Sequence, residues 1–168
     1  LEDIKPVRGR MELAATRKNG ATVYVDYAHT PDAIEVALKS LRAHILGKLI
    51  VIIGAGGERY KEKRPLMGAA AEKNSDFVII TDDNPRNEDP SSIHQMIKNG
   101  IQDNSKVTVI ADRAEAILTA VDLLEVGDGL LIAGKGHETE QFIGENIFPF
   151  DDFEQASLSV ASLDGTEQ

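Results

Sequence analysis

The sequence predicts a three-layer α/β fold, in which a mostly parallel sheet of about six strands carries helices on both faces. Two observations support this prediction. Short apolar runs rich in β-branched residues alternate along the chain with segments whose apolar residues recur at helical spacing. One of these runs, residues 48–53 (KLIVII), is apolar at every position after its first, which is typical of a strand buried on both faces.

The N-terminal part of the chain contains the first strand–helix–strand unit. Residues 1–12 have a mixed composition with Pro6 and Gly9, and they are predicted to be an interdomain linker or an entry segment. Residues 21–26 (ATVYVD) form the first predicted strand. Thr30 followed by Pro31 is typical of a helix N-cap and the first helical position, so a helix should connect this strand to residues 48–53.

The same alternation continues to the C-terminus. Ser91 or Ser92 is predicted to cap the third helix, and Asp112 the fourth. The tail, residues 141–150, is predicted to form a short hairpin or an edge strand. The remaining predicted elements are helices over residues 64–73, about 91–101, 116–124 and about 152–163, and strands over residues 77–80, 106–110 and 129–133.

Length and composition narrow the class of protein. The 168 residues suit one domain with its own hydrophobic core. The absence of cysteine excludes disulfides and thiolate metal sites and fits a reducing cytoplasm. A net charge of −10 argues against unassisted binding to nucleic acid or to an anionic membrane. No signal-peptide pattern or membrane-spanning run occurs, and because residue 1 is Leu, we expect a piece of a longer polypeptide.

Clusters of polar and glycine residues follow the predicted strands. In parallel sheets, ligands bind beyond the carboxyl ends of the strands, and these ends meet on one rim. We therefore predict a ligand site there. The clusters are residues 26–29, 54–59, 82–86, 112–113 and 134–138.

The turn at residues 82–86 has the most specific chemistry. Asp83, Asn84 and Arg86 surround a proline that restricts the backbone. Arg86 of this turn, Arg59 and Glu138 together offer two guanidinium groups and a carboxylate, which suit a zwitterion with two carboxylates and one ammonium. A lysine-like end would leave the guanidinium of Arg86 unpaired, which costs affinity.

Several of the other clusters allow two interpretations. The glycines at 54–57 either bind an anion through their backbone or form a tight turn that needs positive φ, with Arg59 favouring the ligand. Asp26 either bonds a ribose hydroxyl or a magnesium-bound water, or caps its turn. His29 either contacts phosphate or base, or is a half-buried polar residue. The Gly134 carbonyl and Glu138 suit an ammonium group.

Two kinds of site are disfavoured. The four histidines are scattered, so no metal site is predicted. The sequence also contains no dinucleotide fingerprint and no phosphate-binding P-loop, which disfavours a nicotinamide-dependent oxidoreductase.

Taken together and in order, these motifs resemble the C-terminal domain of the Mur ligases. The resemblance extends almost from one end of the chain to the other, and the combination is much more specific than any one motif. The matching segments are GRME at 9–12, DYAHTPD at 26–32, KRPLMG at 63–68, TDDNPR at 81–86, RAEA at 113–116 and GKGHE at 134–138.

The resemblance implies a Rossmann-like domain of a bacterial, cytoplasmic, ATP-dependent amide ligase of peptidoglycan synthesis. Such an enzyme adds meso-diaminopimelate to UDP-N-acetylmuramoyl-L-alanyl-D-glutamate, whose D-glutamate γ-carboxylate ATP first phosphorylates. The turn that contains Asp83 would bind the incoming amino acid. In this assignment Asn84 and Arg86 hold its distal carboxylate, Arg59 its other carboxylate, and Gly134 and Glu138 its distal ammonium. Three further residues would lie on the nucleotide side: Arg10, Asp26 and His29.

The resemblance also implies parts that this sequence does not include. Residues 13–168 would be the C-terminal domain, and ATP and Mg²⁺ would be bound mainly by a central ATPase domain that follows an N-terminal UDP-sugar domain. We therefore expect no catalytic residue in this domain alone and no ligase activity from the chain by itself. Two alternatives remain open: the same kind of ligase adding L-lysine, and a non-catalytic amino-acid-binding module.

Overall fold

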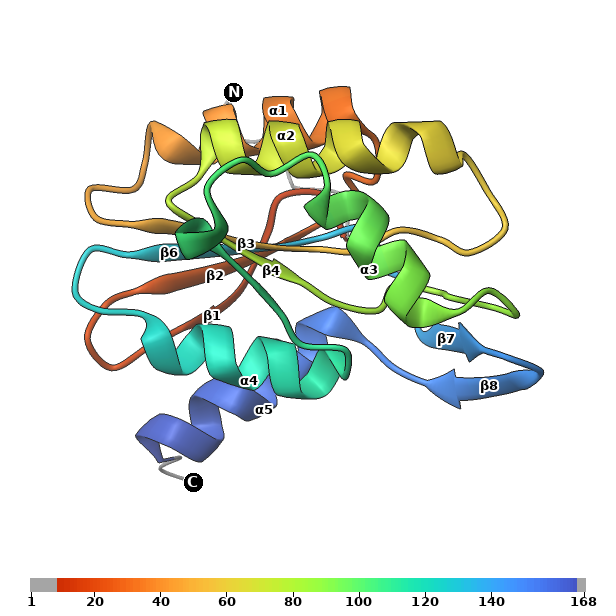
Figure 1. The fold of residues 1–168 in the computed structure, drawn as a ribbon. Helices are drawn as coiled ribbons and strands as arrows, with labels where there is room; N and C mark the ends of the chain where they lie inside the picture. Colours follow the sequence, from red (N-terminus) through yellow and green to blue (C-terminus); the bar gives the residue numbers. More distant parts are fainter. Residues whose placement is uncertain (1–8, 166–168) are drawn as a thin grey trace.

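A six-stranded sheet in the order β1-β2-β6-β3-β4-β5 forms the centre of the structure, a computed structural model that describes residues 9–165 (Figure 1). β1 pairs with β2 in antiparallel orientation, and the other neighbours are parallel. The predicted mostly parallel sheet is confirmed. The strands are β1 (Glu12–Thr16), β2 (Thr22–Asp26), β3 (Leu49–Ile53), β4 (Phe77–Ile80), β5 (Val107–Val109) and β6 (Gly129–Ala133).

Helices cover both faces of the sheet, as predicted. Figure 1 shows α1 (Pro31–Arg42), α2 (Arg64–Asn74) and α3 (Pro90–Lys98) over one face, and α4 (Arg113–Leu123) and α5 (Asp152–Asp164) over the other. The chain proceeds from β2 through β3 and β4 to β5 with its helices on the first face. It then returns by α4 to β6, between β2 and β3. Crossovers between parallel strands are right-handed. When the chain reverses its direction across the sheet, the connecting helix must therefore lie on the other face, so α4 lies on the face opposite α1.

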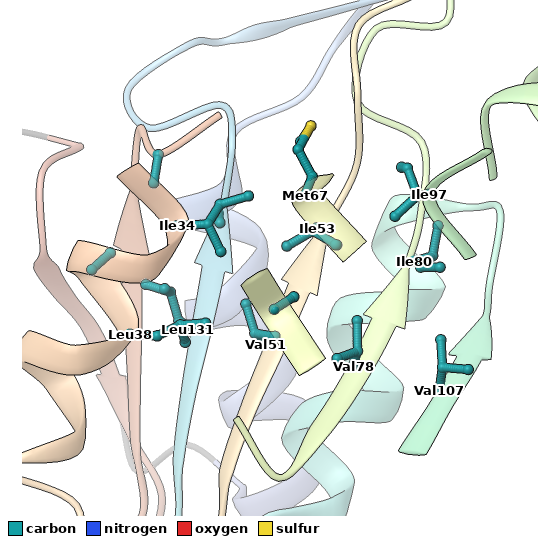
Figure 2. Packing of buried hydrophobic residues seen from close by; sticks show 14 of the residues in the cluster. Ile34, Leu38, Val51, Ile53, Met67, Val78, Ile80, Ile97, Val107 and Leu131 are labelled. Atoms are coloured by element: carbon teal, nitrogen blue, oxygen red, sulfur yellow. The ribbon is translucent and has the colours of Figure 1, made fainter. Parts of the chain in front are cut away.

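The core lies in two layers because the central strands are buried on both sides. Alternate residues of β3 point to opposite faces. Val51 and Ile53 join one cluster with Ile34 of α1 and Met67 of α2, and Figure 2 shows this layer. Ile50 and Ile52 join the second cluster, with α4 and Ala156 of α5. Every residue of β3 is buried, as the apolar run predicted.

Two details, β1 and the cap of α3, differ from the sequence-based expectations. β1 is not expected from the sequence: none of its residues is buried, the half-buried and exposed positions do not alternate regularly, and the register shifts between Leu13 and Ala15. α3 begins at Pro90, before the predicted start at about Ser91. Asp89 is its cap, since the Asp89 side chain accepts a hydrogen bond from Ser91 N and Pro90 takes the first helical position. Neither Ser91 nor Ser92 is therefore the cap. The tail forms the hairpin that was one of its two predicted forms, β7 (Glu140–Ile143) with β8 (Asn146–Pro149), and this hairpin is separate from the main sheet.

Other predicted details are confirmed. Thr30 caps α1 through a hydrogen bond from Ala33 N, and Asp112 caps α4 through one from Glu115 N. Residues 1–8 of the predicted linker lie outside the described residues. Within residues 9–165, no helix has the length and apolar character needed to span a membrane.

Candidate amino-acid-binding site

A pocket of about 290 Å³ opens at the carboxyl ends of β2, β3, β4 and β6. Its volume is at the lower end of the range for small-molecule sites. Four of the five predicted rim clusters contribute to its wall. The lining residues are Tyr27, His29, Thr30, Gly54, Ala55, Gly56, Arg59, Tyr60, Lys63, Arg64, Met67, Asp83, Asn84, Arg86, Gly134 and Glu138.

The hairpin β7–β8 holds the turn after β4 in place. Arg86 N donates to Phe142 O at 3.0 Å, and Gly144 N donates to Arg86 O at 2.6 Å. The Gln141 side chain, which is buried, donates to Asp83 O at 2.9 Å. These bonds keep Arg86 at a φ of 55°, a conformation that residues other than glycine rarely adopt. The turn is therefore shaped by the tail of the chain as well as by its own proline.

The guanidinium of Arg86 faces the pocket with backbone carbonyls as its partners. Its Nη1 donates to Gly57 O and to Asn84 O, each at 3.3 Å. Among residues 9–165, no carboxylate lies within ion-pair distance of it. The positive charge is positioned but not neutralised by a neighbour, so it is available to an anionic group in the pocket.

The glycine turn after β3 serves close packing, and the expectation of positive φ is wrong. Gly54, Gly56 and Gly57 are absent from the positive-φ residues. A Cβ on Gly57 would lie 1.8 Å from Pro85 O, and Gly57 N donates to Asn84 O at 2.8 Å. The glycines thus allow the ends of β3 and β4 to approach each other. This contact brings the Arg86 turn against the pocket wall.

The loop after β6 forms the opposite wall. Gly134 has a φ of 115°, which side chains rarely adopt, and a Cβ there would lie 2.6 Å from Asp83 Oδ2. Both the backbone conformation and the close approach of Asp83 therefore require glycine. Glu138 Oε1 accepts from Asn84 Nδ2 at 3.4 Å and from Lys135 Nζ at 3.3 Å. The predicted meeting of Asn84 and Glu138 is therefore present. Lys135 is wholly buried between them, a position that its sequence neighbours did not indicate.

Asp83 is a buried carboxyl in the same wall, 8% exposed. Burial raises its pKa, and the nearby cations Arg113 and Lys135 oppose this rise. No hydrogen bond to its carboxylate oxygens is present among the described residues. A buried carboxyl that faces a pocket and is only partly compensated is suited to accept a hydrogen bond from a ligand cation.

Arg59 lines the pocket from an exposed loop between β3 and α2. Its neighbours Glu58 and Tyr60 both have positive φ, at 65° and 45°. The buried side chain of Arg64 holds this loop in place. Its two terminal nitrogens contact Glu88, and one of them also donates to Gly56 O at 3.0 Å. Arg64 itself is therefore a structural cation, although it borders the pocket.

The residues expected on the nucleotide side lie at one end of the rim. Asp26 accepts from Met11 N at 2.7 Å and from Ala28 N at 2.8 Å, as expected for the capping interpretation. His29 is exposed, so the half-buried alternative is wrong, and its Nδ1 lies 2.9 Å from Tyr27 O. Arg10 is exposed beside this end.

The fifth cluster does not reach the pocket. Arg113 turns into the core, where it binds Asp152 with both Nε and Nη2, at 2.8 and 2.7 Å. It also donates to Asp82 O and Ala133 O, each at 3.1 Å. Arg113 therefore joins the ends of β4 and β6 to the start of α5. Residues 9–165 contain no group of three or more His, Asp or Glu side chains that could hold a metal ion.

Comparison with known proteins identifies the family. The sequence profile described as "Mur ligase, glutamate ligase domain" matches residues 9–136. The chain belongs to the Mur ligase family. The match covers every pocket segment up to the loop after β6 and ends before Glu138 and the β7–β8 hairpin.

Individual Mur ligases match the whole chain, hairpin included. It is 47% identical over 99% of its length to UDP-N-acetylmuramoyl-L-alanyl-D-glutamate–2,6-diaminopimelate ligase of Agrobacterium fabrum, and 51% identical over 95% to the protein of that name from Synechococcus elongatus. It spans 34% and 32% of these two relatives. A solved structure of a ligase with the same name matches 97% of this chain and 33% of its own, with a TM-score of 0.89 and 38% identity.

Proposed function

We propose that this chain is the C-terminal domain of an ATP-dependent ligase that adds meso-diaminopimelate to UDP-N-acetylmuramoyl-L-alanyl-D-glutamate in peptidoglycan synthesis. The relatives at 47% and 51% identity carry this activity in their names, and the chain spans about a third of their length. The N-terminal and central domains would then belong to the same polypeptide, and residues 13–168 would form the amino-acid-binding domain. The proposed location is the bacterial cytoplasm.

The arrangement of Arg86 and Glu138 around one pocket carries the proposal. The guanidinium of Arg86 has no carboxylate partner among residues 9–165, and Asn84 lies between it and Glu138. This wall is complementary to an α-amino-acid group, in which a carboxylate and an ammonium share one carbon. Diaminopimelate has such a group at both ends, whereas lysine has a bare ammonium at one end. The charge at position 86 therefore favours diaminopimelate.

In the proposed complex, Asn84 and Arg86 hold the distal carboxylate of diaminopimelate. The Gly134 carbonyl, Glu138 and Asp83 accept from its distal ammonium, and Arg59 binds the other carboxylate. The remaining amine is left to attack the acyl phosphate of D-glutamate. The new C–N bond forms as the C–O bond to phosphate breaks, so that inorganic phosphate leaves and the amine loses a proton.

ATP and Mg²⁺ are proposed to bind mainly on the central domain. Two groups at the rim are already engaged within residues 9–165: the N–H of Gly57 donates to Asn84 O, and both oxygens of Asp26 accept from backbone N–H groups, so neither is free for a phosphate or a magnesium-bound water. We assign Arg10, Asp26 and His29 to the border of the nucleotide site. Their part would be to orient the closed domain, while the phosphoryl transfer chemistry takes place elsewhere.

A ligase assay with purified full-length polypeptide tests this function. With UDP-N-acetylmuramoyl-L-alanyl-D-glutamate and ATP, we expect product from meso-diaminopimelate and a far lower kcat/KM with L-lysine. The 168-residue chain alone should form no product. Preference for lysine would contradict the assigned substrate, and turnover by the chain alone would contradict the assigned division of labour.

A further inference from the structure

Lys135 is a buried cation in the pocket wall that is proposed to bind the incoming amino acid. Its side chain is 0% exposed, although it follows β6 at the rim of the pocket. Its Nζ donates to Glu140 O at 2.6 Å, to Asn84 Oδ1 at 3.1 Å and to Glu138 Oε1 at 3.3 Å. An ammonium group has three N–H donors, so all three are used inside the protein. Removing this cation from water is costly, and none of its donors is left for a ligand.

These bonds decide which way the Asn84 carboxamide faces. Its two ends have nearly the same shape, and neighbouring donors and acceptors determine the orientation. Asn84 Oδ1 accepts from Lys135 Nζ and also from Phe142 N at 3.0 Å. The oxygen is therefore fixed toward the protein, and the NH₂ group is left on the side of Glu138 and the pocket. An NH₂ group in that place recognises an acceptor such as a carboxylate.

Lys135 acts on Glu138 in the same way. Both bonds to this side chain, from Lys135 and from Asn84, end on Oε1. Oε2 has no hydrogen-bond partner among residues 9–165, and the side chain is 37% exposed. The carboxylate thus keeps one oxygen for a ligand cation, while its charge is balanced from behind.

We propose that Lys135 is a positioning residue that sets selectivity for an α-amino-acid group at the far end of the incoming substrate. This inference rests on the proposed function. Lys135 contacts no substrate atom itself. It turns one donor group, Asn84 Nδ2, and one acceptor group, Glu138 Oε2, toward the pocket, which match a carboxylate and an ammonium on one carbon.

Lys135→Met in the full-length polypeptide tests this role, with Lys73→Met as the matched control, because Lys73 is exposed on α2. For Lys135→Met we expect KM for diaminopimelate to rise by about tenfold or more, with KM for ATP unchanged. The preference for diaminopimelate over lysine should fall by a similar factor. In an Asn84→Ala background the same change should add less than about threefold, because Lys135 acts partly through Asn84. The control should behave as wild type.

Asn84→Asp tests the orientation without removing the lysine. An aspartate keeps the bond to Lys135 Nζ but places an oxygen on the pocket side, where it repels a carboxylate. We expect the variant to fold and to raise KM for diaminopimelate by about tenfold or more. This variant decides the matter if Lys135→Met does not fold.

Three results would overturn the inference. They are an unchanged KM for diaminopimelate in Asn84→Asp, an unchanged KM in folded Lys135→Met, or equal rises of both KM values in Lys135→Met. If the wild-type enzyme still forms product from diaminopimelate, any of these three results contradicts only the role of Lys135 and not the proposed function. A wild-type enzyme that forms no product from diaminopimelate would overturn the function and this inference together.

Discussion

Two pairs of arginines near the rim have opposite surroundings. Arg64 and Arg113 are buried, and each contacts one carboxylate through two nitrogens, Glu88 and Asp152 respectively. Arg59 and Arg86 line the pocket, and neither has a carboxylate partner among the described residues. Carboxylates of the protein neutralise the charges of the first pair, whereas the second pair has no such carboxylate among the described residues and is positioned for a ligand anion. The difference indicates where a substrate carboxylate belongs.

The largest loss of stability is expected when the Arg113–Asp152 pair is broken. Both side chains are 0% exposed, so Arg113→Leu leaves a buried, uncompensated carboxylate and removes the hydrogen bonds to two backbone carbonyls, Asp82 O and Ala133 O. We expect the free energy of unfolding to fall by about 3–5 kcal/mol, measured by urea denaturation. A loss no greater than that of an exposed arginine variant would remove the distinction between the two pairs.

The Arg64–Glu88 pair should contribute less and should depend on pH. Arg64 lowers the pKa of Glu88 to about 2 from its usual 4.5. A lowered folded-state pKa stabilises the protein above the unfolded value, and this contribution is lost as pH falls from 4.5 toward 2. Glu88→Gln should therefore cost about 2–3 kcal/mol at pH 7 and much less near pH 2. Melting curves of the wild type and of Glu88→Gln between pH 2 and 7 measure this change. A stability difference that does not vary with pH would contradict the lowered pKa of Glu88.

Asp83→Asn should have a smaller effect, with the opposite sign. Burial raises the pKa of Asp83 above 3.8, so the ionised wild-type side chain destabilises the fold increasingly as pH rises through the folded-state pKa. The variant should be more stable than wild type by about 1 kcal/mol at pH 7 and equal to it at pH 3. It should also bind diaminopimelate less well, because an acceptor for the ammonium is lost. Equal stability at both pH values would show that Asp83 is fully compensated.

The smallest effect on stability is expected for Arg59→Ala. The side chain is exposed, so the free energy of unfolding should change by less than about 0.5 kcal/mol, measured under the same denaturation conditions as Arg113→Leu. KM for diaminopimelate should nevertheless rise in the full-length enzyme. A stability loss comparable to that of Arg113→Leu would show that Arg59 belongs with the structural pair.

Local pattern predicted most of the sheet. β4 and β6 have the predicted bounds, because apolar runs between turns are unambiguous when both faces are buried. β1 was missed because an antiparallel edge strand with a register shift has neither a continuous apolar run nor a regular alternation. The cap of α3 has a signal in the sequence, since Asp89 directly precedes Pro90, a residue that favours the first helical position.

The sequence predicted which side chains would gather at one pocket, but it did not predict the buried contacts that support them. Ligands of parallel sheets bind beyond the carboxyl ends of the strands, and the residues predicted there on that basis do line one pocket: Arg59, Asn84, Arg86 and Glu138. The burial of Lys135 depends on Asn84 and on the β7 backbone, separated from it in sequence by 51 and 5 residues. Likewise, the partner of Arg113 lies 39 residues away. Such pairings follow from the strand order, which the sequence did not reveal.

The central claim is that the guanidinium of Arg86 binds a carboxylate of the substrate. The most direct test is the selectivity of the full-length Arg86→Ala enzyme for diaminopimelate over lysine. The matched control is Arg42→Ala, because Arg42 is 44% exposed on α1 in an ion pair with Asp76 outside the pocket. We predict that the ratio of kcat/KM for meso-diaminopimelate to that for L-lysine falls by about 100-fold in Arg86→Ala and is unchanged in Arg42→Ala. An unchanged ratio in Arg86→Ala would contradict the account.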